Sequence, residues 1–242
     1  MGKKKPPKAR EQRVLERVRR ATVGVALSKR EGDQVSLTLE GTGFFIDDPS
    51  GVVLTARHVL DAIEQKTTEE AAKWAGYTLG VLIYRPGDGT QFDLSFTPVL
   101  QDARNPGHDV AALRIGEQPV PPTCLRLGYN LEPREGVMAG TCGWPHGFRP
   151  DEIGPASTFL MGPISGVLPL PEAPAHARTG YILQMPATQG NSGGPVFILN
   201  TGVVFGVVEA KISANEYVTG LTKAQSIQFA RGVAKIAGDG EE

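Results

Sequence analysis

The feature that most constrains the fold is a serine enclosed by glycines just before a run of β-forming residues. Residues 188–196 read Thr-Gln-Gly-Asn-Ser-Gly-Gly-Pro-Val, so Gly190, Gly193 and Gly194 surround Ser192. A backbone that turns tightly around a side chain, and lets another backbone approach it, needs residues without a Cβ atom. Such a turn leaves the Ser192 hydroxyl prominent and can aim backbone N–H groups at one point, as an oxyanion hole requires. The alternative interpretation is a Gly-rich β-turn with an idle surface serine.

The rest of the chain reads as many short strands joined by turns. Its 242 residues include 30 glycines and 19 prolines, which favour turns and short strands over long helices. We expect an all-β protein of two similar β-barrels side by side, with short helices at both ends and a Pro-rich linker over 116–122. The expected boundaries are a basic extension over 1–20, an N-terminal barrel over 21–118, a C-terminal barrel over 119–222, and a C-terminal helix with an acidic tail over 223–242.

Charge is balanced over the whole chain but concentrated at its ends. The net charge is −1, so no global field draws the protein toward nucleic acid or a membrane. Residues 1–20 are rich in lysine and arginine, and Val14, Leu15 and Val18 recur at helical spacing. We favour a basic helix packed on the body by this apolar stripe over a nucleic-acid or membrane contact. The expected docking face of the C-terminal helix consists of Ile227, Phe229, Val233 and Ile236.

The sequence also indicates a compartment. No run approaches the roughly 18 apolar residues of a membrane span, and the basic N-terminus lacks the apolar segment of a secretory signal. The two cysteines, Cys124 and Cys142, are too few for a disulfide framework and are expected to be reduced and buried. We therefore expect a cytoplasmic protein without a membrane span.

Two further polar residues stand where strands begin or end. The apolar strand 52–55 runs straight into Ala-Arg-His, so His58 is expected where a buried strand turns into a short helix. Asp109 opens the apolar strand 110–115, where a buried carboxylate needs a hydrogen-bonding partner. Each residue alone could be structural, as a satisfied histidine or a turn-capping aspartate. Together with Ser192 they supply a nucleophile, a base with a pKa near neutrality and an acceptor that orients the base.

At four motifs the sequence resembles the chymotrypsin-like (trypsin-like) serine peptidases, in particular their HtrA/Deg branch. These motifs are Gly41–Ile46, Leu54–Val59, Asp109–Leu113 and Gly190–Pro195. The resemblance spans about residues 21–222 and implies a double six-stranded antiparallel β-barrel with the active site between the barrels. It implies that Ser192 is the nucleophile, His58 the general base and Asp109 its orienting carboxylate. It also implies an oxyanion hole made of the backbone N–H groups of Gly190 and Ser192.

The sequence departs from the family pattern at several points. Arg57 precedes the histidine where a small or polar residue is usual, and we expect it at the rim of the site. The residue directly after His58 is Val59 and not the cysteine of the digestive-type members, and we expect no PDZ module after the peptidase region. Oligomerisation and substrate delivery therefore cannot be carried over from the HtrA/Deg branch.

The resemblance also locates a substrate pocket. Its walls would be Pro186, Ala187 and Thr188 before the nucleophile, and Val208 and Glu209 on a later strand. Pro186 stands where trypsin-type members have an aspartate, which argues against a Lys/Arg requirement and for a small or apolar residue. If Glu209 faced the pocket it could recruit a basic residue; the alternative is an outward position or an ion pair with Lys211.

These features predict a serine endopeptidase that acts on protein or peptide substrates through an acyl-enzyme. No metal or organic cofactor is expected, because the remaining histidines, His108, His146 and His176, show no ligand spacing. Three alternatives stay open. The fold could be an inactive partner-binding module, or a latent enzyme whose Gly190–Asn191 peptide points the wrong way until an activating partner binds. The least favoured is a nucleic-acid binder acting through the basic extension.

Overall fold

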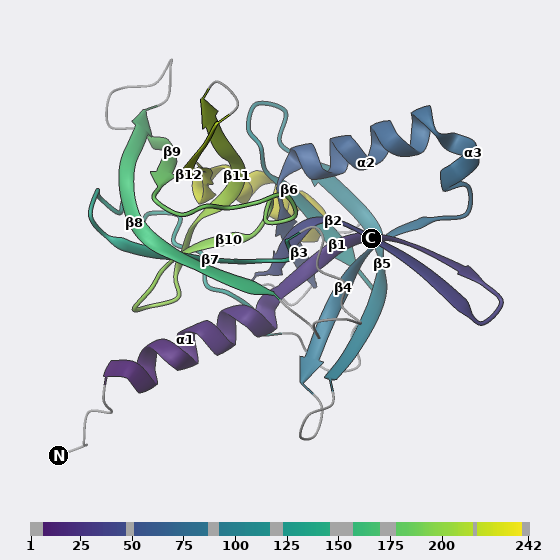
Figure 1. Ribbon diagram of the computed structural model, residues 1–242, viewed down its shortest axis with the longest axis horizontal. Helices are drawn as coiled ribbons and strands as arrows, with labels where there is room; N and C mark the ends of the chain where they lie inside the picture. Colours follow the sequence, from purple (N-terminus) through teal and green to yellow (C-terminus); the bar gives the residue numbers. More distant parts are fainter. Residues whose placement is uncertain are drawn as a thin grey trace.

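The computed structural model describes residues 7–46, 51–86, 92–116, 123–145, 157–169, 178–214 and 217–238. They form mainly β-strands, arranged in two antiparallel sheets of six strands that each close on themselves as a barrel (Figure 1). The N-terminal sheet has the strand order β1-β2-β3-β6-β5-β4, and the C-terminal sheet has the order β10-β11-β12-β9-β8-β7. The expected pair of six-stranded sheets is therefore present. The predicted linker lies outside the described residues, apart from Gly116.

The strands range from 4 residues in β3 to 13 in β5, so several are longer than the short strands that the glycine and proline content predicts. The N-terminal sheet consists of β1 (Thr22–Glu31), β2 (Gln34–Phe45), β3 (Val52–Thr55), β4 (Thr78–Pro86), β5 (Phe92–Arg104) and β6 (Ala111–Ile115). The C-terminal sheet consists of β7 (Met138–Gly143), β8 (Thr158–Pro169), β9 (Arg178–Leu183), β10 (Pro195–Ile198), β11 (Val204–Ala214) and β12 (Tyr217–Ser226).

Helices occupy both ends of the chain and the connection between β3 and β4. They are α1 (Pro7–Ala21), α2 (Arg57–Glu69), α3 (Ala71–Trp74), the 3₁₀ helix η1 (Ile227–Phe229) and α5 (Ala230–Gly238). Helix α2 begins directly after β3, so the predicted histidine lies in its first turn. None of the helices in the described part of the chain is both long and apolar enough to cross a membrane.

The basic helix α1 packs on the body, as its apolar spacing predicts. Val18 is fully buried and Val14 and Leu15 are partly buried against the same core. Arg17 donates a hydrogen bond to the backbone oxygen of Cys124 at 2.9 Å, and the Arg19 guanidinium lies 5.0 Å from the centre of the Phe159 ring. Neither cysteine is part of a disulfide; Cys142 is buried as predicted, whereas Cys124 is only partly buried.

The C-terminal end differs from the prediction in two respects. Strand β12 continues to Ser226, past residue 222 where the helix was expected, because residues 222–225 pair with β9. Of the predicted docking face, Ile227 and Val233 are buried and Phe229 is partly buried. Ile236 was wrongly included, since it is 57% exposed.

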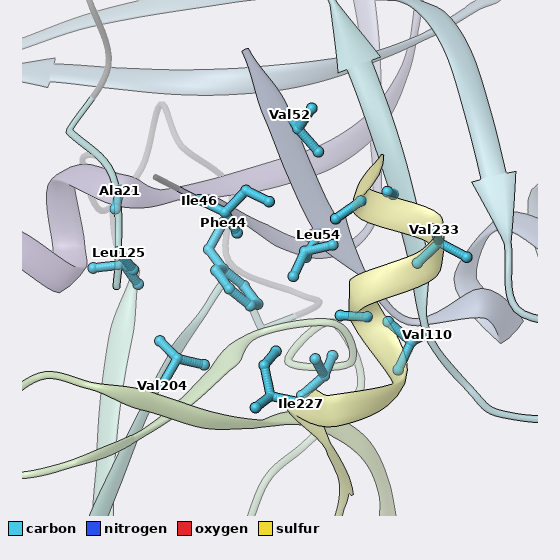
Figure 2. Packing of buried hydrophobic residues seen from close by; sticks show 14 of the residues in the cluster. Ala21, Phe44, Ile46, Val52, Leu54, Val110, Leu125, Val204, Ile227 and Val233 are labelled. Atoms are coloured by element: carbon cyan, nitrogen blue, oxygen red, sulfur yellow. The ribbon is translucent and has the colours of Figure 1, made fainter. Parts of the chain in front are cut away.

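The largest core cluster joins the two sheets. Figure 2 shows Phe44 and Leu54 of the N-terminal sheet clustered with Val204 of the C-terminal sheet. Ile227 and Val233 of the C-terminal helices complete the cluster (Figure 2). Two smaller clusters fill the N-terminal and the C-terminal sheet separately. The C-terminal helices therefore help to hold the two sheets together.

A matched pair of leucine truncations tests this packing. Leu54 is 0% exposed in the shared cluster, whereas Leu100 in β5 is 66% exposed. We expect Leu54→Ala to lower the free energy of unfolding by about 2–5 kcal/mol, because a cavity is added to the lost burial. Leu100→Ala should change it by no more than about 0.5 kcal/mol. Urea unfolding followed by circular dichroism measures both values, and equal losses would contradict the assigned core.

Candidate active site

The ends of two neighbouring strands bring His58 and Asp109 together. Strand β3 is buried along its whole length and pairs with β6, with Thr55 opposite Ala111. His58 follows the end of β3, and Asp109 precedes the start of β6. The Nδ1 atom of His58 lies 2.6 Å from Oδ2 of Asp109, and the backbone N–H of His58 donates to Oδ1 at 2.8 Å. One carboxylate thus orients the imidazole and satisfies an N–H group in the first turn of α2, where helices leave such groups unpaired.

The pair has an electrostatic consequence. The Asp109 side chain is 14% exposed and that of His58 is 46% exposed. Burial alone would lower the pKa of His58, but the hydrogen bond and the charge of Asp109 more than offset it. The charges of Glu209 and Asp61 act in the same direction. The pKa of His58 is therefore raised above its ordinary value.

Arg57 fastens the loop that carries Asp109, a role that the sequence did not reveal. Its guanidinium donates from Nη1 to the backbone oxygens of Asn105 at 3.1 Å and Pro106 at 2.8 Å. The Asn105 side chain accepts from the backbone of Gly107 at 3.0 Å and donates to the backbone oxygen of Phe229 at 3.0 Å. The only sequence signal was an unusual arginine beside the histidine, and its reach across to this loop is a property of the fold.

The loop that carries Ser192 is fixed to strand β11. The backbone N–H of Gly193 donates to the oxygen of Val208 at 2.8 Å, and the N–H of Val208 donates to the oxygen of Gly194 at 2.9 Å. Gly190 and Gly193 adopt φ values of 90° and 87°, which side chains other than glycine rarely allow. A Cβ atom on Gly193 would lie 2.0 Å from the backbone oxygen of Thr42. The prediction that the turn around Ser192 requires glycine is therefore confirmed at Gly190 and Gly193.

Thr42 of β2 connects the serine loop to the N-terminal sheet. Its backbone N–H donates to the oxygen of Ser192 at 2.8 Å. Its hydroxyl donates to the oxygen of Gly190 at 2.5 Å and accepts from the N–H of Trp144 at 2.9 Å. The backbone oxygen of Thr42 accepts from the hydroxyl of Thr55 at 2.7 Å. The serine loop is thus tied, through buried groups, to the end of the strand that precedes His58.

The Ser192 hydroxyl itself is bonded within its own sheet. Its Oγ donates to the backbone oxygen of Glu209 at 3.3 Å. Among the described residues, no hydrogen bond joins Ser192 to His58. The structure therefore brings His58 and Asp109 into direct contact and Ser192 to the same junction of the two sheets, without a Ser192–His58 bond.

The two predicted oxyanion-hole donors belong to the turn that carries Ser192. Within the described part of the chain, the backbone N–H groups of Gly190 and Ser192 have no acceptor. The Gly190–Asn191 peptide is held by Thr42, which bonds its carbonyl oxygen. Asn191 is buried, and its backbone N–H donates to the oxygen of Thr188 at 3.1 Å. Two donors without partners therefore lie beside the serine.

Three of the predicted pocket residues, residues 186–188, lie on a segment that is tied to β12, and the other two, Val208 and Glu209, lie on β11. The hydroxyl of Thr222 accepts from the N–H of Ala187 at 3.0 Å and donates to the oxygen of Met185 at 2.6 Å. Ala187 and Val208 are buried, whereas Pro186 and Thr188 are exposed.

Glu209 forms an ion pair within the described part of the chain. Its Oε1 lies 2.6 Å from Nζ of Lys223 on β12, a partner that the sequence did not indicate, and the side chain of Lys211 lies outside the described part. The basic group that Glu209 recruits thus belongs to the chain itself.

Comparison with known proteins identifies the family. A family profile described as "Trypsin-like peptidase domain" matches residues 41–207, a span that includes His58, Asp109 and Ser192. No curated protein sequence gives a significant match. Among solved structures, a variant of the HtrA-type protease AlgW with decapeptide is 19% identical at a TM-score of 0.61, over 93% of this chain and 65% of that chain. This chain thus spans just under two thirds of that protein's length.

Two further structures share the fold. Deg5 is 19% identical at a TM-score of 0.60, over 96% of this chain and 95% of that chain. The Rv3671c protease from M. tuberculosis, in its active form, is 22% identical at a TM-score of 0.61, over 96% of this chain and 87% of that chain. At these identities the structures show a common fold. The family profile matches well over half of the sequence, and the chain therefore belongs to the trypsin-like peptidase family.

Proposed function

We propose that the chain is a serine endopeptidase that hydrolyses peptide bonds of protein or peptide substrates through an acyl-enzyme. The observation that carries this proposal is the two-point contact of Asp109 with His58, at the junction where Thr42 holds the Ser192 loop. A carboxylate on Nδ1 leaves Nε2 as the ring nitrogen free to act as a base, which is the arrangement that acyl transfer to a serine needs.

In the proposed mechanism, Nε2 of His58 removes the proton from Ser192 as Oγ attacks the substrate carbonyl carbon. The N–H groups of Gly190 and Ser192 stabilise the negative oxygen that forms. The resulting imidazolium is stabilised by Asp109 and gives its proton to the leaving amine when the C–N bond breaks. A water molecule then loses a proton to His58, attacks the acyl carbon and releases the acid and Ser192.

The Ser192 hydroxyl has to turn from the Glu209 oxygen toward His58 before it reacts. Catalytic hydrogen bonds are often absent or long before substrate binds, and a serine side chain changes rotamer on a picosecond to nanosecond scale. A latent enzyme, or a partner-binding module, is the second candidate. The absence of a Ser192–His58 bond among the described residues is the observation that favours it.

The proposed substrate preference is a small or apolar residue before the scissile bond. The side chains of Ala187 and Val208 are small or apolar, and no carboxylate stands at Pro186. Glu209 is already engaged by Lys223 of the same chain, which disfavours its pairing with a basic side chain of a substrate. A peptide-library cleavage profile would test this preference.

A fluorophosphonate probe separates the two candidates. We expect the wild-type protein to become labelled, and Ser192→Ala to lose both the label and turnover, by a factor on the order of 10⁵–10⁶ in kcat. His58→Ala should lose a similar factor, because the residues act as a unit. Ser165→Ala, a change at an exposed serine of β8, is the control and should label normally. An unlabelled wild-type protein would favour the latent or inactive form.

The pH dependence of kcat/KM tests the role of the carboxylate. Activity requires neutral His58, so it should fall as the pH drops through a midpoint above the ordinary histidine pKa of 6.5. Asp109→Asn removes the hydrogen bond and charge that raise this pKa. It should move the midpoint to lower pH and reduce kcat by about 10⁴-fold. His108→Gln should leave the midpoint unchanged; a midpoint that followed His108 instead would contradict the assignment.

Replacing Thr42 tests the link between the sheets. Thr42→Val keeps the shape but leaves the Gly190 oxygen and the Trp144 N–H without a partner, at a cost of about 1–3 kcal/mol for each buried group. We expect a lower kcat in the folded protein, since the serine loop loses its anchor. Thr22→Val, which removes a buried hydroxyl bonded to Val18, is the control: it should reduce stability but leave kcat unchanged. Equal kcat values for the two variants would contradict the anchoring role.

A further inference from the structure

Glu209 has a carboxylate close to the proposed catalytic groups that the mechanism above does not use. The residue sits at an irregularity of the β11–β12 pairing, between Val208 and Ala210. Its backbone oxygen accepts the hydrogen bond of Ser192. Its side chain is 19% exposed and reaches Lys223 of β12, whose own side chain is 41% exposed. The residue whose backbone oxygen accepts from the proposed nucleophile therefore also takes part in an ion pair.

Only one of the two carboxylate oxygens of Glu209 has a partner among the described residues. Oε1 of Glu209 is 2.6 Å from Nζ of Lys223, whereas Oε2 is buried and has no hydrogen-bonding partner among the described residues. A carboxylate oxygen that is shielded from water and lacks a donor keeps much of its field, because neither solvent nor a dipole offsets it. Lys223 supplies the compensating positive charge from the more exposed side.

Titratable groups lie on several of the elements near His58, and three of them act on its pKa. On its own helix, Asp61 faces it, and Arg57 is engaged with Asp61 at 3.4 Å and with the backbone of the Asp109 loop. From that loop come Asp109 and His108, whose ring is stacked on Phe229. From the C-terminal sheet come Glu209 and its partner Lys223. Besides Asp109, the charges of Glu209 and Asp61 raise the pKa of His58.

We propose that Glu209 and Lys223 form a charge pair that sets how readily His58 accepts the proton of Ser192. Glu209 acts through space on the imidazolium and is a positioning residue outside the proposed triad, and Lys223 limits its effect. The inference rests on the proposed role of His58 as the general base. The pair belongs to the C-terminal sheet, whereas His58 lies in α2, directly after β3 of the N-terminal sheet. The charge pair would therefore couple the two halves of the protein electrostatically, in addition to the hydrogen bonds of Thr42.

The pair can be tested without relying on turnover. In the full chain carrying Ser192→Ala, the imidazole of His58 is titrated by NMR, with its signals assigned by comparison with a His58→Gln variant. Glu209→Gln should shift the titration midpoint to lower pH, because a charge that favours the imidazolium is lost. Lys223→Met should shift it to higher pH, because Glu209 is no longer balanced. The double variant should return toward the parent value.

The control is an equivalent ion pair remote from His58. Lys66 of α2 lies 2.6 Å from Glu40 of β2, and neither of these residues contributes to the pKa of His58. Lys66→Met should therefore leave the midpoint unchanged. In the protein with Ser192 intact, activity at acidic pH is expressed as a fraction of each variant's own maximum. This fraction should be several-fold higher in Glu209→Gln than in the wild type, and lower in Lys223→Met than in the wild type.

The result that would overturn the proposal is a midpoint that stays unchanged, or moves in the same direction, in both single variants. If Glu209→Gln fails to fold, Lys223→Met alone tests the proposal: a higher titration midpoint supports it, and an unchanged or lower midpoint contradicts it. The outcome can be separated from that of the proposed function. Triad-dependent turnover with an unmoved midpoint would remove this inference alone, and a moved midpoint in a protein without turnover would remove the peptidase proposal alone.

Discussion

The hydrogen bond from the backbone N–H of Thr42 to the oxygen of Ser192 is the contact on which the candidate site depends. It joins β2 of the N-terminal sheet to the glycine turn at the entry to β10 of the C-terminal sheet. His58 and Asp109 are adjacent to the ends of β3 and β6 in the N-terminal sheet, and Ser192 precedes β10 in the C-terminal sheet. The contacts between the two sheets therefore determine how these three residues lie relative to one another. The close approach explains Gly193: the backbone oxygen of Thr42 occupies the space of a side chain there. Apolar packing of Phe44, Leu54 and Val204 supports the same junction.

The charged side chains near His58, among them Asp109 and Glu209, are partly buried. Asp109 is held by two donors from the first turn of α2, which keeps one carboxylate in place without a counter-ion of its own. Glu209, on the C-terminal sheet, forms an ion pair with Lys223. Both carboxylates raise the pKa of His58, Asp109 by direct contact and Glu209 by its charge. In a partly desolvated site such charges are felt more strongly than in water, so that the proton affinity of His58 becomes a property of both sheets.

Local patterns in the sequence were sufficient to predict much of this arrangement. The glycine-enclosed serine predicted a turn with φ values that favour glycine, and the buried strand ending at Thr55 predicted where His58 stands. What the sequence could not show depends on strand register and on long side chains that cross between elements. Arg57 reaches a loop that lies 48 residues further along the chain, and Glu209 meets Lys223 because β11 and β12 pair with an irregularity between them. The exposure of Ile236 likewise depends on how the last helix sits in the shared core.

The most direct measurement of the central claim is a crystal structure of the protein after reaction with a peptidyl phosphonate. The account predicts a covalent bond from the phosphorus to Oγ of Ser192. It also predicts a phosphonyl oxygen within about 2.7–3.1 Å of the N–H groups of both Gly190 and Ser192, and Nε2 of His58 within about 2.6–3.2 Å of that Oγ. An adduct with the oxygen turned away from both N–H groups, or with the imidazole of His58 out of reach of Ser192, would contradict it.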